Sequence, residues 1–228
     1  MYHFSSPPRS DELYHYGVKG MKWGVKNGPP YPLNQNKLSS DIFRAAKTRE
    51  PVITKDITEV FDKNLVTPYG LEHRLKSRRS IERKIHKDAV EKGVSEAEVS
   101  KGIRDAVRYT GILSDENYTR TYNQIKRDLA NKGYREIRCR NYFDQYRKGK
   151  VKHKSVQSIF ETRDGYPFEI QFHTKGSQRA KNDKLPLYEE ARKIETTADR
   201  KRELERMMVE LAEKVKDPKD VYSIKSYG

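Results

Sequence analysis

The chain has a single cysteine among its 228 residues, so no disulfide bond can form within it. This composition fits a reducing compartment. Cys139 lies in the strand-like stretch YREIRCRNY, where a buried thiol is the first interpretation and a nucleophile the second.

Apolar residues are also scarce, at 34% of the chain against 36% charged residues. No apolar run approaches the ~20 residues that cross a membrane. The first residues, MYHFSSPPRSDE, lack the apolar core of a secretory signal. We therefore expect no membrane-spanning segment and a cytoplasmic location.

Several common catalytic and nucleotide-binding motifs are missing. The chain has no Walker A motif, no GxGxxG and no kinase glycine loop, which disfavours the common nucleotide-binding folds. Cysteine and histidine residues do not have the spacing of a zinc site, and no serine, histidine and aspartate set stands out as a triad.

Basic residues, in contrast, are abundant. The 48 lysines and arginines exceed the 33 aspartates and glutamates, which gives a formal net charge of +15. Such a surplus favours polyanionic partners, namely nucleotides, nucleic acid or an anionic membrane surface. Charge alone does not choose among them.

The composition changes along the chain and suggests three parts. Residues 1–39 are rich in proline, glycine, serine and tyrosine and predict a flexible arm. Within the arm, the stretch LYHYGVKGMKWGVKN reads either as an aromatic docking peptide or as a tail with incidental aromatics. Residues 40–216 predict one folded domain, followed by a tail over residues 217–228.

Periodicity within the folded part predicts alternating helices and strands. We first expect two short helices separated by Pro51, a helix over 80–92, a strand over 105–113 and a helix capped by Ser114 or Asp115. A strand over 134–143 and a basic loop over 144–154 should follow. The rest predicts a hairpin over 155–174 that turns at Asp164-Gly165, and then one long helix or two in line over 185–218. This order indicates an α/β or α+β fold with a mixed sheet.

The stretch GYPFEIQFHT, residues 165–174, has an unusual polar row. Read as a strand, it alternates between an apolar set and a polar set, namely Phe168, Ile170 and Phe172 against Glu169, Gln171 and His173. The polar row is either a solvated outer face or part of a reactive site.

Asp105 and Glu169 are acidic residues in strands otherwise poor in acid. Two carboxylates brought together would repel and would need a cation, and a divalent metal ion that also holds phosphate oxygens is a common solution. Two unrelated surface acids are the alternative.

A basic cluster lies upstream, in the stretch HRLKSRRSIERK at the start of a predicted helix. Backbone N–H groups at a helix start also attract anions, so this cluster could clamp a triphosphate. A solvated basic face or a general nucleic-acid patch is the alternative.

Four segments occur in a familiar order: RLKSRRSIERKI, IRDAVRYTGIL, KHKSVQSIF and GYPFEIQFHT. Their order and separations resemble the synthetase domain of RelA/SpoT-type alarmone synthetases, most of all small toxin-like relatives that carry FELQFHT. The resemblance covers about residues 40–200. It implies a nucleotidyltransferase-like fold with a mixed five-stranded sheet flanked by helices, and an ATP-dependent pyrophosphokinase that moves the β,γ-pyrophosphate of ATP to a ribose 3′-hydroxyl.

The resemblance also implies roles for particular residues. The catalytic and Mg²⁺-binding residues would be Asp105 and Glu169, with Glu169 taking the proton from the attacking hydroxyl. The ATP-binding residues would be Arg74, Lys76, Ser80 and Lys84. The acceptor-binding residues would be His153, Lys154, Gln171 and His173. Strand alternation places Gln171 and His173 on the face of Glu169, and a merely structural hydrogen bond is the alternative for these two.

One segment departs from the family pattern. Guanosine-using members carry GYRSxH, whereas this chain has KHKSVQ, with His153 in the tyrosine position and Gln157 in the histidine position. The acceptor therefore stays open between a purine nucleotide and the 3′ end of a tRNA, which the nearby basic residues could meet through phosphates.

The arm carries a second resemblance, because YHYGVKGMKWGV is similar to a segment found at the ends of virion-associated phage proteins. It implies a phage-borne or toxin-like effector in a bacterial host or on the virion, with an antitoxin or a phage virion protein as partner of the arm. The alternative is a non-enzymatic virion-associated or nucleic-acid-binding protein that retains the fold.

Overall fold

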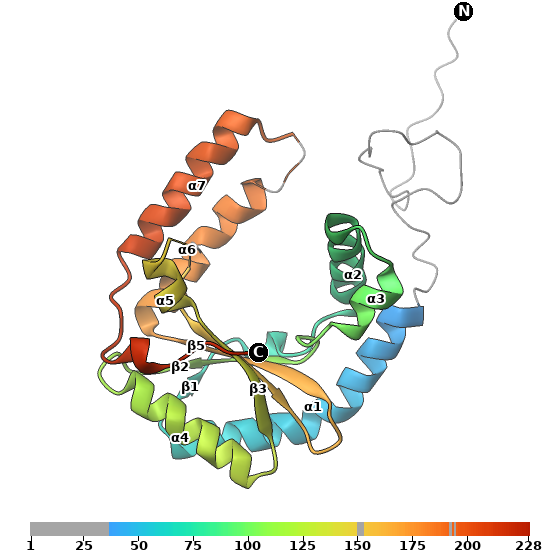
Figure 1. The fold of residues 1–228 in the computed structure, drawn as a ribbon, viewed down its shortest axis with the longest axis vertical. Helices are drawn as coiled ribbons and strands as arrows, with labels where there is room; N and C mark the ends of the chain where they lie inside the picture. The colour runs from blue at the N-terminus through green and yellow to red at the C-terminus, as the bar shows by residue number, and fades with distance from the viewer. Residues whose placement is uncertain (1–36, 150–152, 192, 194) are drawn as a thin grey trace, which may run out of the picture. The chain divides into compact units, whose positions relative to one another are not determined.

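A mixed five-stranded sheet forms the centre of the computed structural model, which describes residues 37–149, 153–191, 193 and 195–228 (Figure 1). The strands are β1 (Thr67–Pro68), β2 (Arg108–Ile112), β3 (Arg135–Asn141), β4 (Val156–Glu161) and β5 (Pro167–His173). Their order is β1-β2-β5-β4-β3, with β2 and β5 parallel and every other pair antiparallel. The expected fold class is confirmed.

Helices lie on both faces of the sheet. They are α1 (Lys37–Lys63), α2 (Arg78–Lys92), α3 (Glu96–Lys101), α4 (Tyr118–Asn131), α5 (Tyr142–Arg147), α6 (Lys175–Ala191) and α7 (Ala198–Glu213), with short 3₁₀ helices η1 (Leu71–His73) and η2 (Val221–Ser223). Figure 1 shows α1 and α4 along one face, and the pairs α2–α3 and α6–α7 at opposite ends of the other. In this part of the chain no helix has the length and apolar character that a membrane crossing needs.

The apolar side of β5 forms the centre of the core. Phe168, Ile170 and Phe172 are fully buried. Tyr134 and Tyr122 meet Phe168 and Phe172 edge to face, with ring centroids 5.4 and 5.2 Å apart. Because α4 carries Tyr122, this side of the sheet faces the α1–α4 layer.

The polar side of β5 is buried as well. Glu169, Gln171 and His173 are 7%, 5% and 3% exposed. The interpretation as a solvated outer face is therefore wrong, and these side chains must be satisfied by protein groups or by a ligand.

Helix α1 is continuous through Pro51, whereas the sequence predicted two short helices. A proline inside a helix costs about 3 kcal/mol because it removes a hydrogen bond and its ring clashes with the preceding turn. Ile53, Ile57 and Phe61 are fully buried on one face of α1, and each contributes about 1.5–3 kcal/mol. Burial therefore outweighs the cost of the proline.

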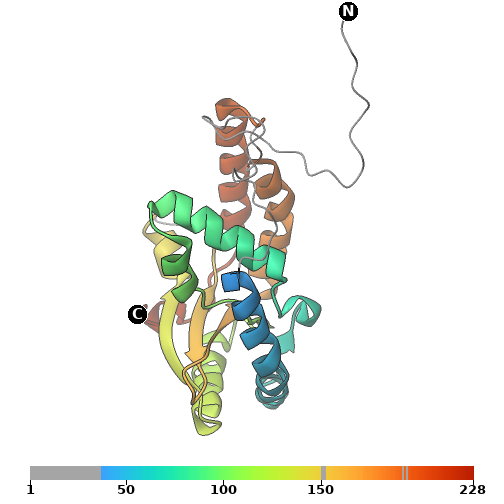
Figure 2. The same ribbon diagram turned by 90° about the vertical axis from the view of Figure 1, so that its right-hand side faces the viewer.

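Helices α6 and α7 pack side by side as a helical hairpin (Figure 2), so the prediction of one helix or two in line is wrong. The hydroxyl of Thr197 accepts a hydrogen bond from the backbone N–H of Arg200 at 3.3 Å and caps the start of α7. Leu204 of α7 is fully buried. The N-cap at Thr197 and the burial of Leu204 explain why a second helix starts after α6.

Three smaller details also differ from the expectation. Asn117, not Ser114 or Asp115, is the N-cap residue of α4. Helix α5 takes up the last two residues of the predicted strand and the first part of the predicted basic loop. At the hairpin turn only Gly165 has a left-handed φ, of 79°. Asp164 instead uses its carboxylate to accept hydrogen bonds from Arg49 on α1 at 2.8 and 3.0 Å.

The last residues of the chain lie along the free edge of β3. The backbone of Tyr227 exchanges two hydrogen bonds with Cys139, at 2.9 and 3.0 Å. The side-chain amide of Asn141 donates to the carbonyls of Val221 and Ile224. Cys139 is fully buried, which confirms its interpretation as a buried thiol.

Gly111 on β2 allows a close approach of the core, because a Cβ atom there would lie 2.9 Å from Phe61 Cζ and from Val66 Cγ1. We expect Gly111→Ala to lower the free energy of unfolding by about 1–3 kcal/mol through overpacking. Gly176→Ala is the control, because its Cβ would have no neighbour closer than 3.8 Å and helix propensity favours alanine by about 1 kcal/mol. Denaturant unfolding followed by circular dichroism measures both, and equal stabilities would contradict the packing.

Candidate active site

Glu169 lies in the middle of the sheet, on the polar side of β5. The neighbouring parallel strand β2 places Arg108 in register with it. One oxygen of Glu169, Oε2, accepts a hydrogen bond from Gln171 Nε2 at 3.1 Å. The carboxylate is thus nearly enclosed and faces basic side chains.

Asp105 lies three residues before β2, on the segment that leads into this strand. Its Oδ2 atom accepts hydrogen bonds from Lys76 and from Lys84, the latter at 3.1 Å. Its Oδ1 atom is buried and has no hydrogen-bond partner among the described residues. One carboxylate oxygen is therefore left for a ligand.

The surroundings move the two carboxyl groups in opposite directions. Burial raises the pKa of Glu169, and the charge of Asp105 adds to this effect, while Arg108 and Lys76 act against it. Burial also acts to raise the pKa of Asp105, but the charges and hydrogen bonds of Lys76 and Lys84 outweigh it and lower the pKa. Carboxyl groups whose pKa values are pushed apart are typical of an acid–base site.

The predicted ATP-binding residues lie around the start of α2. Arg74 is held by Glu50 of α1 through its Nε atom, and it donates from Nη1 to the carbonyl of Leu71 at 2.8 Å. Ser80 lies in the first turn of α2, where its hydroxyl accepts from Ser77 at 3.0 Å. Lys84 follows one turn later. Of the four residues, Lys76 and Lys84 contact Asp105, whereas Arg74 is engaged by Glu50 of α1.

The four predicted acceptor-binding residues line one cavity of about 560 Å³. Its walls come from β4, β5, α6, α7 and the segments beside them. His173 Nε2 is buried and has no hydrogen-bond partner within the described part of the chain, while Nδ1 lies 2.9 Å from the Ser177 hydroxyl. Burial is the largest effect on His173 and lowers its pKa well below the usual value, and the charge of Lys181 lowers this pKa further. The ring is therefore neutral near pH 7.

His153 lies at the exposed side of this cavity, with its ring centroid 4.2 Å from that of Tyr142. The pKa of His153 is lowered to about 4. Loss of water around the ring is the largest cause, and the charges of Lys184 and Lys181 act in the same direction. A neutral ring beside an aromatic neighbour can stack on a base.

Lys154 also lines the cavity, but its ammonium group is engaged by the protein. It donates to the carbonyl of Val215 at 2.7 Å, lies 2.9 Å from Asp217 Oδ1 and sits 4.6 Å from the ring centroid of Tyr146. The structure thus ties Lys154 to the C-terminal part of the chain.

The structure adds basic residues that the sequence reasoning missed. Arg108 and Arg138 act on Glu169 from β2 and β3, and Lys181 and Lys184 reach the cavity from α6. A signal was present, because Ser177, Lys181 and Lys184 follow the strand at steps of four and three and so share one helix face. The pattern has meaning only once α6 is known to start directly after β5.

Asp105 and Glu169 are the residues that could hold a divalent ion. The described residues contain no group of three or more histidine, cysteine, aspartate or glutamate side chains suited to a metal. Mg²⁺ in phosphate-transfer sites is usually bound by one or two carboxylates together with substrate phosphates. The unpartnered Oδ1 of Asp105 fits that kind of site.

Comparison with solved structures shows which known proteins share this fold. Small alarmone synthetase 2 from Bacillus subtilis is 15% identical, with a TM-score of 0.52, over 76% of this chain and 91% of that one. A chain of the complex between the type VI effector Tas1 and its immunity protein is 17% identical, with a TM-score of 0.50, over 78% of this chain and 95% of that one. The fold is therefore that of the RelA/SpoT-like alarmone synthetases.

The arm has a separate relationship. A family of unknown function (DUF7211) matches residues 6–30, which lie outside the described residues, as does the predicted docking segment. No curated protein matches the chain.

The raised pKa of Glu169 predicts how stability depends on pH. A carboxyl group whose folded-state pKa is raised stabilises the fold fully below its unfolded pKa, and this contribution is lost as pH rises through the folded-state pKa. Because glutamine does not ionise, we expect Glu169→Gln to raise the melting temperature more near pH 8 than near pH 5.

Calorimetry at both pH values measures this difference. Glu116→Gln, in an exposed turn, is the control and should change the melting temperature little at either pH. A lower melting temperature for Glu169→Gln near pH 8 would mean that the cations around Glu169 outweigh its burial.

Proposed function

We propose that this protein is an ATP-dependent pyrophosphokinase that transfers the β,γ-pyrophosphate of ATP to the ribose 3′-hydroxyl of a purine nucleotide or of tRNA. The observation that carries the proposal is the pair of carboxylates at neighbouring parallel strands, one held ionised by two lysines and the other buried with a raised pKa. The fold shared with a small alarmone synthetase supports it.

The residues divide the chemistry between them. Arg74, Lys76, Ser80 and Lys84 would bind the ATP phosphates and stabilise charge on their oxygens. The acceptor 3′-oxygen bonds to the β-phosphorus, the bond from that phosphorus to the oxygen of the α-phosphate breaks, and AMP leaves. Glu169, which is buried, takes the hydroxyl proton, and its raised pKa suits a general base.

Mg²⁺ would be held by Asp105 and Glu169 and would neutralise phosphate charge when bound. Separate segments contribute these residues. Arg74 and Lys76 precede α2, and Ser80 and Lys84 lie on it. Asp105 precedes β2, and Glu169 lies on β5. Their joint placement is what the proposed reaction requires.

The cavity beside β5 is the proposed acceptor site. Its volume of about 560 Å³ suits a nucleotide. Neutral His153 would stack on the base, and Gln171 and His173 would offer polar atoms to it. Because the ammonium of Lys154 is engaged by Val215 and Asp217, we propose that it holds the cavity wall and does not bind phosphate directly.

A toxin-like effector acting in the bacterial cytoplasm is our proposal for the biological setting. The fold shared with a chain of the complex between the type VI effector Tas1 and its immunity protein favours an antitoxin or immunity partner. The phage-like arm favours a phage-borne origin and a virion protein as the partner of residues 1–39.

A nucleic-acid-binding protein without turnover is the second candidate. The net charge of +15 and the exposed residues Arg78, Arg79 and Arg83 on α2 favour it. Retention of both carboxylates favours the enzyme.

Incubation with γ-labelled ATP and each of GDP, GTP, ADP, ATP and bulk tRNA, followed by chromatography, tests the two candidates. We expect label on one acceptor and release of AMP. Absence of both with every acceptor would exclude the enzyme and leave the binding protein.

Substitution of the carboxylates tests the assignment of the site. We expect Asp105→Asn and Glu169→Gln each to lower kcat by at least about 10²-fold, because a metal-binding and proton-accepting group is lost. Glu116→Gln is the matched control and should retain activity. Activity that persists in both site variants would overturn the assignment.

The division into an arm and a catalytic domain predicts that deletion of residues 1–36 spares catalysis. The described domain starts with α1 at Lys37, and the proposed site residues all follow it. The same chromatographic assay on the truncated chain measures this. If transfer were lost while the thermal melt stayed unchanged, residues 1–36 would be needed for catalysis.

A further inference from the structure

Glu50 is a buried acid in the middle of α1, and it is 7% exposed. Its Oε1 atom accepts hydrogen bonds from Arg74 Nε and from the hydroxyl of Thr54. The Thr54 hydroxyl in turn lies 2.8 Å from the hydroxyl of Tyr109 on β2. One carboxylate therefore joins α1, the sheet and the segment that carries Arg74.

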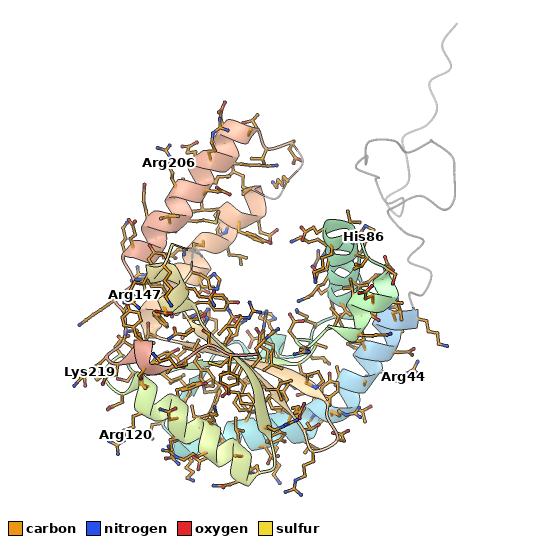
Figure 3. All side chains as sticks on the ribbon, viewed as in Figure 1. Arg44, His86, Arg120, Arg147, Arg206 and Lys219 are labelled. Carbon is orange, nitrogen blue, oxygen red and sulfur yellow. The ribbon has the colours of Figure 1, made fainter. Side chains whose placement is uncertain are left out.

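The helices beside this carboxylate are neighbours. Helix α1 packs against α2, and Figure 3 shows Arg44 of α1 and His86 of α2 at the same end of the molecule. Glu50 follows Arg44 by less than two helical turns, and Arg74 precedes α2 by four residues. The contact between Glu50 and Arg74 thus ties α1 to the start of the proposed ATP site.

Arg74 is held at two points of its guanidinium group. Glu50 binds Nε, and Nη1 donates to the carbonyl of Leu71 at 2.8 Å. Because a guanidinium group is planar and rigid, two bonds to different segments fix its orientation. Three of its five N–H donors have no partner within the described part of the chain, and the side chain is 34% exposed. These three donors are available to the oxygens of an anion.

The directions of the hydrogen bonds agree with an ionised Glu50. Burial raises the pKa of Tyr109, so its hydroxyl keeps its proton and donates to Thr54, which donates to Glu50. Burial also acts to raise the pKa of Glu50, but the hydrogen bonds of Thr54 and Arg74 and the charge of Arg74 outweigh it and lower the pKa. Glu50 is therefore a charged acceptor for Arg74.

Stability alone gives no reason for an acid at this place. Ala46, Ile53 and Ile57 of the same helix are fully buried. A buried ion pair is often no more stable than apolar side chains of similar volume. The carboxylate is explained better by its effect on the orientation of Arg74.

We propose that Glu50 is a positioning residue that holds the guanidinium of Arg74 in the orientation in which its three unpaired N–H groups meet the phosphates of ATP. The inference rests on the proposed function, since Arg74 is one of the proposed ATP-binding residues. Glu50 acts through Arg74 and not by contact with the nucleotide. An arginine that is already oriented loses less side-chain freedom when it binds phosphate.

Glu50→Met tests the proposal, because it keeps much of the side-chain volume, suits a helix and removes the acceptor. Titration calorimetry with Mg²⁺ and the α,β-methylene analogue of ATP, whose bridge between the α- and β-phosphates cannot be cleaved, measures the affinity without turnover. We expect Kd to rise roughly two- to tenfold, which is the cost of ordering one long side chain on binding. Glu50→Gln, which keeps an oxygen that can accept from Arg74, should restore most of the affinity.

A double-mutant cycle shows whether Glu50 acts through Arg74. Arg74→Met removes the side chain that Glu50 is proposed to orient. In that background we expect Glu50→Met to cause no further loss of affinity. Equal losses in the two backgrounds would overturn the positioning role.

Glu59→Met is the matched control. Glu59 is an exposed glutamate on the same helix, and it is paired with Lys132 at 2.6 Å. Its substitution removes an ion pair of α1 but should leave Kd for the analogue unchanged. Thermal melts accompany all variants, and a lower melting temperature of Glu50→Met with an unchanged Kd would mean that the ion pair is only structural.

A second readout needs no nucleotide. Nitrogen-15 NMR of the arginine Nε–H groups, with Arg74→Lys used to assign the signal, follows the hydrogen bond from Arg74 to Glu50 directly. We expect the Nε–H of Arg74 to exchange with water faster in Glu50→Met than in the wild type.

The outcomes distinguish this inference from the proposed function. If the wild type binds the analogue but labels no acceptor, the proposed reaction fails and the Kd values still decide the role of Glu50. If the wild type binds no analogue, the proposed function and the role of Glu50 in ATP binding both fail, and the Nε–H exchange shows whether Glu50 orients Arg74 for another anion. Unchanged Nε–H exchange in Glu50→Met would overturn the positioning role in either case.

Discussion

The parallel pairing of β2 with β5 is the constraint on which the site depends. It sets Arg108 opposite Glu169 and brings the segment carrying Asp105 to the same side of the sheet. Parallel strands need a long crossover, and here that crossover consists of α4, β3, α5 and β4. Residues 64 positions apart in sequence therefore share one electrostatic environment.

This environment has more cations than anions, which explains how two carboxylates can be kept there. Lys76 and Lys84 bind Asp105 directly, whereas Glu169 receives a neutral amide donor and more distant positive charges. The first carboxyl group is stabilised in its charged form, whereas at the second burial outweighs the attraction and raises the pKa. Such an asymmetric pair suits a proposed cation site in which one of the two carboxyl groups also takes a proton.

Helix α6 links the cavity to the sheet. It follows β5 after Thr174 alone, so its inward face starts beside His173, where Ser177 meets the imidazole ring. One turn later Lys181 reaches Gln171. The same helix therefore forms a wall of the proposed acceptor site and contacts the glutamine that donates to the proposed base.

The sequence by itself determined the strand that carries Glu169, the order of the segments and the alternation of β5, because these depend on local periodicity and on motif order. Only the tertiary structure decided that the polar row of β5 is buried and that α1 continues through Pro51. It also decided that α6 and α7 pack against each other and that Val215 and Asp217 engage the ammonium of Lys154. Each of these features depends on contacts between residues far apart in the chain, and their energies outweigh the local preferences that a sequence pattern records.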